Sequence, residues 1–432
     1  MTKSDLITSS EYVEVPFIAV KIGEYAFGSI HSSSDGLINR VGTTVKKMYP
    51  NFMKSIRIVK INGTVNTYSI NLIYAIQPGD DPNKIDYILS TISSDRKIYI
   101  SYGDCSKPSY IFREEEAIIT SVSSNVNVAG SNISYTIEAI STSLPLMANF
   151  NDFAATEAKP SDELKSMIRN QKYGIADVFK GMRDFSKLVA SGIIASNDKK
   201  VRLEAQTGVS TWDRIKYLVG CMVNVADSAN TIIKNSTYLL TIDDSINNLL
   251  GGTCFKVKEV PVAMNTASSE EVFEVDIGYP GKTFVTGFNV LTNDAWSLLY
   301  KASNAGEAPK YVYKINNEGK MVQVDSPSLV QSNVYNRVTT YDSNWWSDVT
   351  QFPINASLTI RGLLKPSILL QYVKLNVLFF GQKHISSGYY IITKQEDIID
   401  ASGYRTNLSL TRLNDPSESA INSIHGGGGG NF

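Results

Sequence analysis

The chain has 432 residues, of which 41 are Lys or Arg and 42 are Asp or Glu, so its formal net charge is −1. The length allows two or three domains with buried cores, and a hydrophobic share of 43% excludes disorder along the whole chain. The balanced charge argues against a basic nucleic-acid-binding surface as the main function, although it leaves room for a local patch.

Cysteine spacing and apolar runs narrow the class further. Cys105, Cys221 and Cys254 lie far apart and form no C-x-x-C pair, which excludes zinc-finger and thioredoxin-type motifs. Three such thiols are typical of core residues in a protein that folds in a reducing cytosol. The N-terminus lacks the apolar segment of a secretory signal, and no apolar run reaches the ~20 residues of a membrane span. We expect neither a signal peptide nor a membrane anchor.

Residues 1–145 are predicted to form a first β domain. Apolar residues alternate with polar ones in several short runs, which is the period of strands with one buried face. Asn62 and Gly63 form a dipeptide that is typical of a hairpin turn. The alternation is interrupted at Asp81, which can cap a helix that begins with Pro82. We therefore expect a sheet with one helix.

Residues 146–253 are predicted to form a helical insertion. A polar, alanine-rich connection leads to Ser161, after which apolar residues recur at the helical spacing. Ser210 or Thr211 can cap a further helix whose apolar face includes Leu218. Amphipathic stripes of this kind nearly always pack into a core, so they carry no functional assignment.

Residues 254–414 are predicted to form a second β domain. A short helix is expected after Asn293, and a hairpin turn over residues 316–319. The run 352–413 alternates and is broken by proline and glycine, which indicates an antiparallel sheet or barrel. Earlier strands are expected over residues 255–262, 272–277 and 283–291.

The C-terminal residues 415–432 contain five consecutive glycines. Such a segment is expected to be a flexible tail without a preferred conformation. The alternative is a tether that becomes ordered against a partner.

The two β domains share an internal echo. Ile-Ile-Thr occurs at 118–120 and again at 391–393, and Gly130 and Gly403 follow at the same distance. The alternation after each glycine also agrees, so that Ile133, Tyr135 and Ile137 answer Thr406, Leu408 and Leu410. Few identities support the echo, and a chance match is the alternative. As a repeat, it predicts two related β domains.

Catalytic and ligand-binding motifs are incomplete. Gly281, Lys282 and Thr283 resemble the end of a phosphate-binding P-loop, but the glycine required five residues earlier is Asp276. His384 is predicted to be a hydrogen-bonded loop residue rather than a base. The three histidines show no metal-ligand spacing; they are His31, His384 and His425.

Acidic residues give no better candidate. The run Glu114, Glu115 and Glu116 is expected to be a solvated edge or loop, and Asp80 with Asp81 is interpreted as a helix start. No G-x-S-x-G elbow occurs, and nothing selects a catalytic pair of carboxylates, although two that meet only in the folded chain stay open. We predict no enzymatic activity and no catalytic, cofactor-binding or metal-binding residues.

Long segments near the C-terminus carry a resemblance to a known family. GLLKP, YVKLNVLFFGQKHISSGYYIITKQ and IDASGYRTNLSLTRL, all within residues 352–413, resemble the C-terminal half of the central baseplate hub proteins of contractile-tailed bacteriophages. VTGFN at 285–289 and Asn-Trp-Trp at 344–346 give weaker support. The helical middle region shows no family motif.

The resemblance implies an α+β, mainly β fold: two related tube-like β-barrel domains, 1–145 and 254–414, with the helical insertion 146–253 between them. It implies a structural virion protein, a homotrimeric hub that joins the hexameric tail tube to the trimeric central spike and forms part of the ejection channel. Three copies would present six tube domains.

The partners and the location follow from the same resemblance. The implied partners are tail tube initiator proteins and the central spike protein, with the tape measure protein and baseplate wedge proteins as further contacts. DNA only passes through the channel. The implied location is the tail baseplate of the virion, after assembly in the host cytoplasm.

Two other functions stay open. The first is a tail-associated peptidoglycan hydrolase, against which the missing nucleophile and zinc motifs argue. The second is a receptor- or glycan-binding tail protein, which predicts glycan binding by the isolated monomer.

Overall fold

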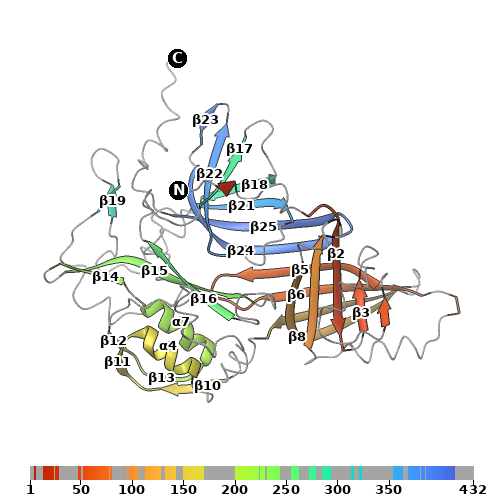
Figure 1. Ribbon diagram of the computed structural model, residues 1–432, viewed down its shortest axis with the longest axis horizontal. Helices are drawn as coiled ribbons and strands as arrows, with labels where there is room; N and C mark the ends of the chain where they lie inside the picture. Colours follow the sequence, from red (N-terminus) through yellow and green to blue (C-terminus); the bar gives the residue numbers. More distant parts are fainter. Residues whose placement is uncertain are drawn as a thin grey trace.

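The protein, for which a computed structural model was obtained, contains a large β-sheet and a smaller α/β lobe (Figure 1). The structure describes residues 4–5, 13–23, 25–28, 47–49, 52–76, 78–79, 92, 97–104, 106, 112–127, 132–142, 149–169, 200–222, 224–228, 231–243, 254–261, 272–278, 285–292, 313–315, 321–323, 354–362, 368–379, 381–384 and 386–413.

The large sheet takes strands from both ends of the chain. Those before residue 145 are β1 Ser4–Asp5, β2 Pro16–Ile22, β3 Tyr25–Gly28, β4 Lys47–Tyr49, β5 Met53–Ile61, β6 Thr67–Ala75, β7 Lys97–Asp104, β8 Phe112–Asn127 and β9 Asn132–Ser141. Those after residue 253 are β17 Val272–Ile277, β18 Val285–Thr292, β21 Ile354–Arg361, β22 Tyr372–Phe379, β23 Gln382–Lys383, β24 Gly388–Asp400 and β25 Gly403–Arg412.

These 16 strands form one continuous sheet. Its main path is β1-β17-β22-β24-β5-β6-β9-β8-β7-β2-β3-β4, with β25, β21 and β18 branching from β24, and with β23 on β22. Most pairings are antiparallel. The prediction of a mainly β fold is confirmed, but these 16 strands form one sheet and the described strands form no closed barrel, so the two-barrel arrangement is not confirmed.

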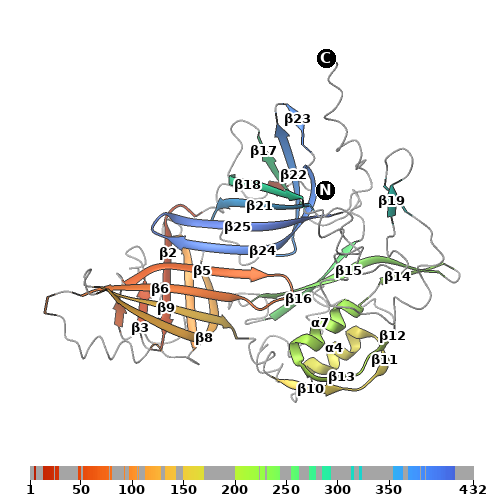
Figure 2. The ribbon, with the colours of Figure 1, turned by 180° about the vertical axis from the view of Figure 1, so that it is seen from behind.

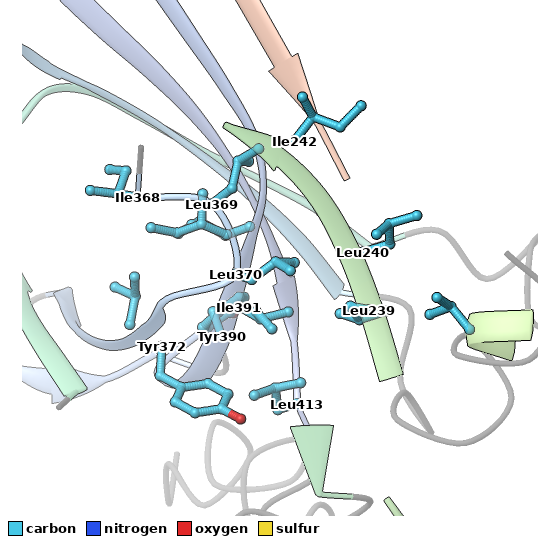
Figure 3. Packing of buried hydrophobic residues seen from close by; sticks show 14 of the residues in the cluster. Leu239, Leu240, Ile242, Ile368, Leu369, Leu370, Tyr372, Tyr390, Ile391 and Leu413 are labelled. Atoms are coloured by element: carbon cyan, nitrogen blue, oxygen red, sulfur yellow. The ribbon is translucent and has the colours of Figure 1, made fainter. Parts of the chain in front are cut away.

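Two hydrophobic cores hold the sheet together. One fills the concave side of the first β domain, and it also takes Ile399 and Tyr404 from the tip of the β24–β25 hairpin. The other lies on the second β domain, where Leu239 and Leu240 of the middle region belong to the same buried cluster as Leu370 (Figure 3). The cores therefore join segments that are far apart in the sequence.

The middle region is a mixed α/β lobe rather than a purely helical insertion (Figure 2). Its helices are α4 Pro160–Arg169 and α7 Thr211–Cys221; its strands are β10 Phe150–Phe153, β11 Thr156–Ala158, β12 Val201–Leu203, β13 Gln206–Ser210, β14 Asn224–Ser228 and β15 Thr231–Asp243. β10 pairs with β13 and β11 with β12, so the short strands enclose α4 in the chain, and α7 follows β13 directly. The sequence does not predict these four strands, because each has five residues or fewer and shows little alternation.

Both described helices of the lobe begin within about one residue of the predicted position. Pro160 opens α4, where its missing N–H is harmless, and acidic residues occupy the first turn. Ser210 caps α7: its Oγ accepts the N–H of Asp213 at 3.0 Å. β15 continues by pairing with β16 Cys254–Pro261, a strand that the sequence assigned to the second β domain.

One predicted turn is described, and for another the strands on either side of it are paired. Gly63 has φ 74° in the turn between β5 and β6, as the hairpin dipeptide predicts, and β19 Tyr313–Ile315 pairs with β20 Met321–Gln323. The helices expected after Asp81 and Asn293 and the C-terminal tail lie outside the described residues. Within the described chain, no helix is long and apolar enough to cross a membrane.

A close approach at Gly362 ties the two β domains together. The N–H of Gly362 donates to Tyr404 O at 2.8 Å, and its carbonyl accepts the Val13 N–H at 3.1 Å, just before β2. A Cβ at this position would lie 2.1 Å from Tyr404 Cγ. Only glycine fits without a shift of the ring or the backbone.

We expect Gly362→Ala to lower the free energy of unfolding by about 2–3 kcal/mol, because the added methyl overpacks the junction. Gly79→Ala is the matched control: Gly79 has φ +92°, and a Cβ added there would meet no atom within 4 Å, so it should lose only about 1 kcal/mol through backbone strain. Chemical denaturation of both variants checks the order. Equal losses would argue against the steric account.

Candidate functional site

The residues considered for catalysis do not form a site in the described part of the chain. His384 lies in a turn, where its Nδ1 is 2.7 Å from Ser386 Oγ and its backbone N–H donates to Val377 O at 2.9 Å. It is thus the hydrogen-bonded loop histidine that the sequence predicts. His31, His425, Asp80, Asp81 and the run Gly281 to Thr283 lie outside the described residues.

The described residues also contain no reactive-cysteine site and no metal-binding site. Burial raises the pKa of the Cys221 thiol to about 12, so little thiolate forms at neutral pH. This agrees with the predicted core role for Cys221; the side chains of Cys105 and Cys254 are outside the described set. Among the described residues, no group of three or more His, Cys, Asp or Glu side chains could hold a metal ion.

The main feature is a repeat of five strands. In chain order the first unit is β5, β6, β7, β8 and β9, and the second unit is β18, β21, β22, β24 and β25. In the sheet they lie as β5-β6-β9-β8-β7 and β18-β21-β25-β24-β22, and every one of these pairings is antiparallel. Because the crossed spatial order is the same, the sequence echo is confirmed as a structural repeat.

A bulge marks the same position in both units. In each unit the long hairpin strand has a register shift at one threonine, Thr120 in β8 and Thr393 in β24. The Thr120 hydroxyl donates to Glu138 O at 3.1 Å, and the Thr393 hydroxyl donates to Ser409 O at 3.2 Å. These are the threonines of the two Ile-Ile-Thr triplets, so the short identity corresponds to a shared backbone feature.

The predicted register of the following strand is wrong by two residues. The sequence echo pairs Tyr135 with Leu408, whereas the two sheets align it with Thr406. In the first unit the last pair of the β8–β9 hairpin is Asn127 with Asn132, so four residues connect the strands. In the second unit the last pair of the β24–β25 hairpin is Asp400 with Gly403, so two residues connect them. An even shift leaves every side chain on its own face, which is why the alternation still matched.

The repeat ends outside the five strands. β7 is followed in the sheet by β2, which runs antiparallel to it. β22, the counterpart of β7, is followed by β17, which runs parallel to it. The two β domains are therefore related through a common unit and differ in the strands added to it.

The two units join edge to edge at β24. One edge of β24 pairs with β25 along most of its length; the other pairs with β22 through residues 388–391 and with β5 through residues 394–399. Arg57 Nε lies 2.5 Å from Glu396 Oε1 and Lys394 Nζ lies 3.2 Å from Glu396 Oε2, on the outer face of this pairing. The first unit thus continues the second unit as one sheet.

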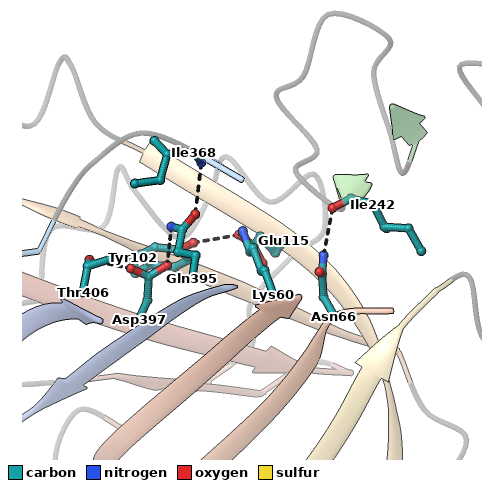
Figure 4. A network of polar contacts seen from close by, with 9 residues as sticks. All are labelled: Lys60, Asn66, Tyr102, Glu115, Ile242, Ile368, Gln395, Asp397 and Thr406. Carbon is teal, nitrogen blue, oxygen red and sulfur yellow. Dashed lines mark hydrogen bonds and ion pairs between the residues drawn. The ribbon is translucent and has the colours of Figure 1, made fainter. Parts of the chain in front are cut away.

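Buried polar side chains line the inner face of the junction (Figure 4). Lys60 Nζ lies 2.5 Å from Glu115 Oε1, and both side chains are fully buried. The Tyr102 hydroxyl donates to the same oxygen at 2.7 Å. Since β5 and β8 are not neighbours in the sheet, this contact spans the concave side, and the sheet is strongly curled there.

A second group of buried hydrogen bonds lies beside the Lys60–Glu115 pair (Figure 4). Gln395, opposite Lys60 in the β24–β5 pairing, accepts the Ile368 N–H at 3.0 Å and donates to Asp397 Oδ2 at 2.9 Å. The Thr406 hydroxyl donates to Asp397 Oδ1 at 2.7 Å. These bonds hold β24, β25 and the segment before β22 of the second unit together at the junction, because satisfied buried polar groups are costly to disrupt.

The prediction for the acidic run was wrong at Glu115. Glu115 shares its face of β8 with the buried Ala117 and Ile119, so the strand period places it inside. Glu116, one residue on, faces out and pairs with Lys97 at 2.7 Å. The alternation places Glu115 inside, whereas a run of like charges is normally solvated, so the two patterns give opposite predictions at this residue.

No protein-family model and no curated protein sequence matches the chain. Solved structures similar to it are phage tail proteins and type VI secretion components. The 43 kDa tail protein of prophage MuSo2 from Shewanella oneidensis is 10% identical, with a TM-score of 0.46, and the match covers 91% of this chain and 96% of that one.

Two further similar structures were found. The tail protein from Neisseria meningitidis MC58 is 7% identical, with a TM-score of 0.46, over 92% of this chain and 97% of that one. The E. coli c3393 protein, described as a type VI secretion component with structural similarity to the T4 bacteriophage tail proteins gp27 and gp5, is 9% identical. Its TM-score is 0.42, over 84% of this chain and 74% of that one.

Acid should weaken the junction between the units. Burial alone would raise the pKa of Glu396, but hydrogen bonds and charge from Arg57 and Lys394 hold the pKa below its ordinary value. A carboxyl with a depressed pKa in the folded state contributes stability above its unfolded pKa, about 4.3, and loses it as the pH falls through the folded pKa. The contribution is therefore full at neutral pH.

We expect Glu396→Gln to be less stable than the wild type at pH 7, and the difference to shrink below about pH 4. Urea unfolding at several pH values checks this. A difference that stays constant across the acid range would show that the ion pairs at Glu396 do not contribute.

Proposed function

We propose that the protein is a structural component of a contractile-tail baseplate, a homotrimeric hub that joins a hexameric tail tube to a trimeric central spike. The repeat of the five-stranded unit carries the proposal. A chain with two related units offers six of them in a trimer, so one face can match six-fold symmetry and the other three-fold symmetry.

The junction at β24 supports the proposal in a second way. It shows how one unit can follow another by continuing the sheet from edge to edge, without a change in fold. Repetition of such a step around an axis closes a ring when the rotation closes, and closure also protects strand edges from non-specific pairing. In this account, residues 1–145 and 254–414 form the tube-like β domains.

The other segments have supporting roles in the proposal. The α/β lobe of residues 146–253 projects from the units (Figure 2) and is available to surrounding baseplate proteins. The tail 415–432 is proposed as a tether to the spike. The channel is proposed to pass DNA without binding it, and the location is the virion tail. No observation favours the hydrolase or the glycan-binding alternative.

Light scattering tests the proposal. It is measured on the purified chain alone and on the chain mixed with tail tube initiator and spike proteins. The expected result is three copies of the 47.6 kDa chain, either as a free trimer or as a complex whose mass is that of the trimer plus the bound partners. A monomer that persists with both partners present would contradict the hub function. A lysis band in a cell-wall zymogram would instead support the hydrolase.

A further inference from the structure

Each edge that joins the two units has a counterpart elsewhere in the repeat. In β24, residues 394–399 pair with β5 of the other unit. The bulge at Thr120 aligns these residues with residues 121–126 of β8. This stretch pairs with β9 on one edge, and no described strand lies on its other edge. Within the described residues, the first unit thus has the same kind of edge without the strand partner that its counterpart has.

The complementary edge belongs to β18. By strand order β18 is the counterpart of β5, and the bulges at Lys54 and Thr286 align them residue for residue. β5 pairs on both edges, with β6 and β24. β18 pairs with β21, and no described strand lies on its other edge.

The side chains on both edges are more exposed than their counterparts. Ile399 and Ile56 lie opposite each other in the internal junction and are buried. Their counterparts are Val126, which is 57% exposed, and Phe288, which is only partly buried. A large apolar side chain at an exposed strand edge is expected where another strand docks.

Neither edge has the features that normally prevent pairing. Residues 121–126 read Ser-Val-Ser-Ser-Asn-Val, and residues 286–292 read Thr-Gly-Phe-Asn-Val-Leu-Thr. Both runs lack proline, lysine and every other charged residue, which proteins commonly place on strand edges that must stay unpaired. These edges are therefore competent to add a strand.

We propose that residues 121–126 of β8 pair antiparallel with β18 of a second copy of this chain, in the register of the internal β24–β5 junction. Val126 then lies opposite Phe288 of the second copy, and Ser124 opposite Val290. The contact is head to tail, so each copy uses one edge of each kind and the chain of copies can close. The inference rests on the proposed function for its partner, a second copy, and specifies the contact between copies.

Disulfide trapping tests the register. Opposed residues on neighbouring antiparallel strands have Cβ atoms about 4.5–5.5 Å apart, close enough for a disulfide after a small adjustment. The variant Ser124→Cys with Val290→Cys is made in the full chain with Cys105 and Cys254 replaced by serine and the buried Cys221 retained. Mild oxidation should give a ladder of linked copies on a denaturing gel.

Three controls define specificity. Ser124→Cys alone and Val290→Cys alone should give no ladder, because the contact needs both edges. Asn125→Cys with Val290→Cys should cross-link at least about tenfold less, because adjacent residues of a strand point to opposite faces. Dimers from Ser124→Cys alone would show that two β8 edges meet each other and would overturn the inference.

The outcomes separate this inference from the proposed function. A ladder that ends in a closed ring of a number other than three supports the strand pairing and contradicts the trimeric hub. A trimer by light scattering without specific cross-links overturns the strand pairing and leaves the hub. A chain that stays monomeric and uncross-linked overturns both.

A charged substitution gives an independent readout. Val126→Glu should abolish the oligomer, because it places a carboxylate against Phe288 of the next copy. Phe150→Glu is the matched control, since Phe150 is 66% exposed on the α/β lobe; it should leave the mass unchanged. Circular dichroism melting confirms that both variants fold. An oligomer that survives Val126→Glu overturns the inference.

Discussion

Replacement of Lys60 by methionine is expected to lower the free energy of unfolding by about 3–5 kcal/mol. Methionine fills most of the space but leaves Glu115 as an unpaired carboxylate on the concave side of the sheet. The ammonium and the carboxylate lie 2.5 Å apart and are fully buried. A buried charge that loses its partner keeps the whole cost of its desolvation.

Removal of both charges should restore much of this stability. The double variant Lys60→Met with Glu115→Leu replaces the pair by apolar groups of similar volume, which is often neutral. Arg57→Met on the same strand is the control. The Arg57 side chain, which pairs with Glu396, is 55% exposed. Its removal should therefore lower the free energy of unfolding by at most about 1 kcal/mol.

Hydrogen exchange followed by mass spectrometry is the appropriate measurement, because a chain with several parts need not unfold in one step. In Lys60→Met, β5, β8 and β24 should exchange faster, and in the double variant they should regain protection. If the double variant is as unstable as Lys60→Met, the cause is packing rather than the unpaired charge.

Replacement of Arg214 by methionine should open the α/β lobe, again at a cost of about 3–5 kcal/mol. The guanidinium is fully buried; its Nε and Nη2 donate to Glu163 Oε1 at 3.0 and 2.5 Å and so tie α7 to α4. Its Nη1 donates to Glu204 O at 3.0 Å and to Gln206 Oε1 at 3.2 Å. Methionine can replace none of these bonds.

Aromatic rings add to the effect of Arg214. Its Cζ lies 4.8 Å from the ring centroid of Phe153 and 4.9 Å from that of Tyr217, and such cation–π contacts strengthen when desolvated. Lys216→Met is the control on the same helix. Lys216 pairs with Asp213 at the surface, so its loss should stay within about 0.5 kcal/mol.

The measurement for Arg214 is again local exchange. Residues 150–169 and 201–222 should lose protection in Arg214→Met, while β5 to β9 keep theirs, because the lobe has its own packing. A uniform loss of protection across the whole chain would show that the lobe and the sheet unfold together.

The repeat could be predicted from the sequence because two of its features leave local marks. Thr120 and Thr393 occupy equivalent bulges, and the apolar alternation beyond each bulge follows from one buried face. The register could not be predicted, because the hairpin loops differ by two residues and the pattern repeats every two. A period-two signal cannot detect an even shift.

The Lys60–Glu115 pair and the short strands of the α/β lobe could not be predicted from the sequence for a different reason. The alternation places Lys60 and Glu115 on the inner face of their strands. A charged residue is expected on a buried face only if an opposite charge lies beside it, and here the two are 55 residues apart in the sequence, so the sequence does not show the pairing. The strands β11 and β12 have three residues each and pair although more than 40 residues, α4 among them, separate them in the chain. Long-range pairing of short segments leaves no periodic signal in either one.

The central claim is that both units of each chain occupy equivalent places around one axis. Single-particle cryo-electron microscopy of the oligomer, reconstructed without imposed symmetry, tests it most directly. We predict a three-fold ring in which the two units of each copy alternate at equal radius, with β18 of one copy beside β8 of the next. A ring in which only one unit faces the axis, or an assembly with two-fold symmetry, would contradict the account.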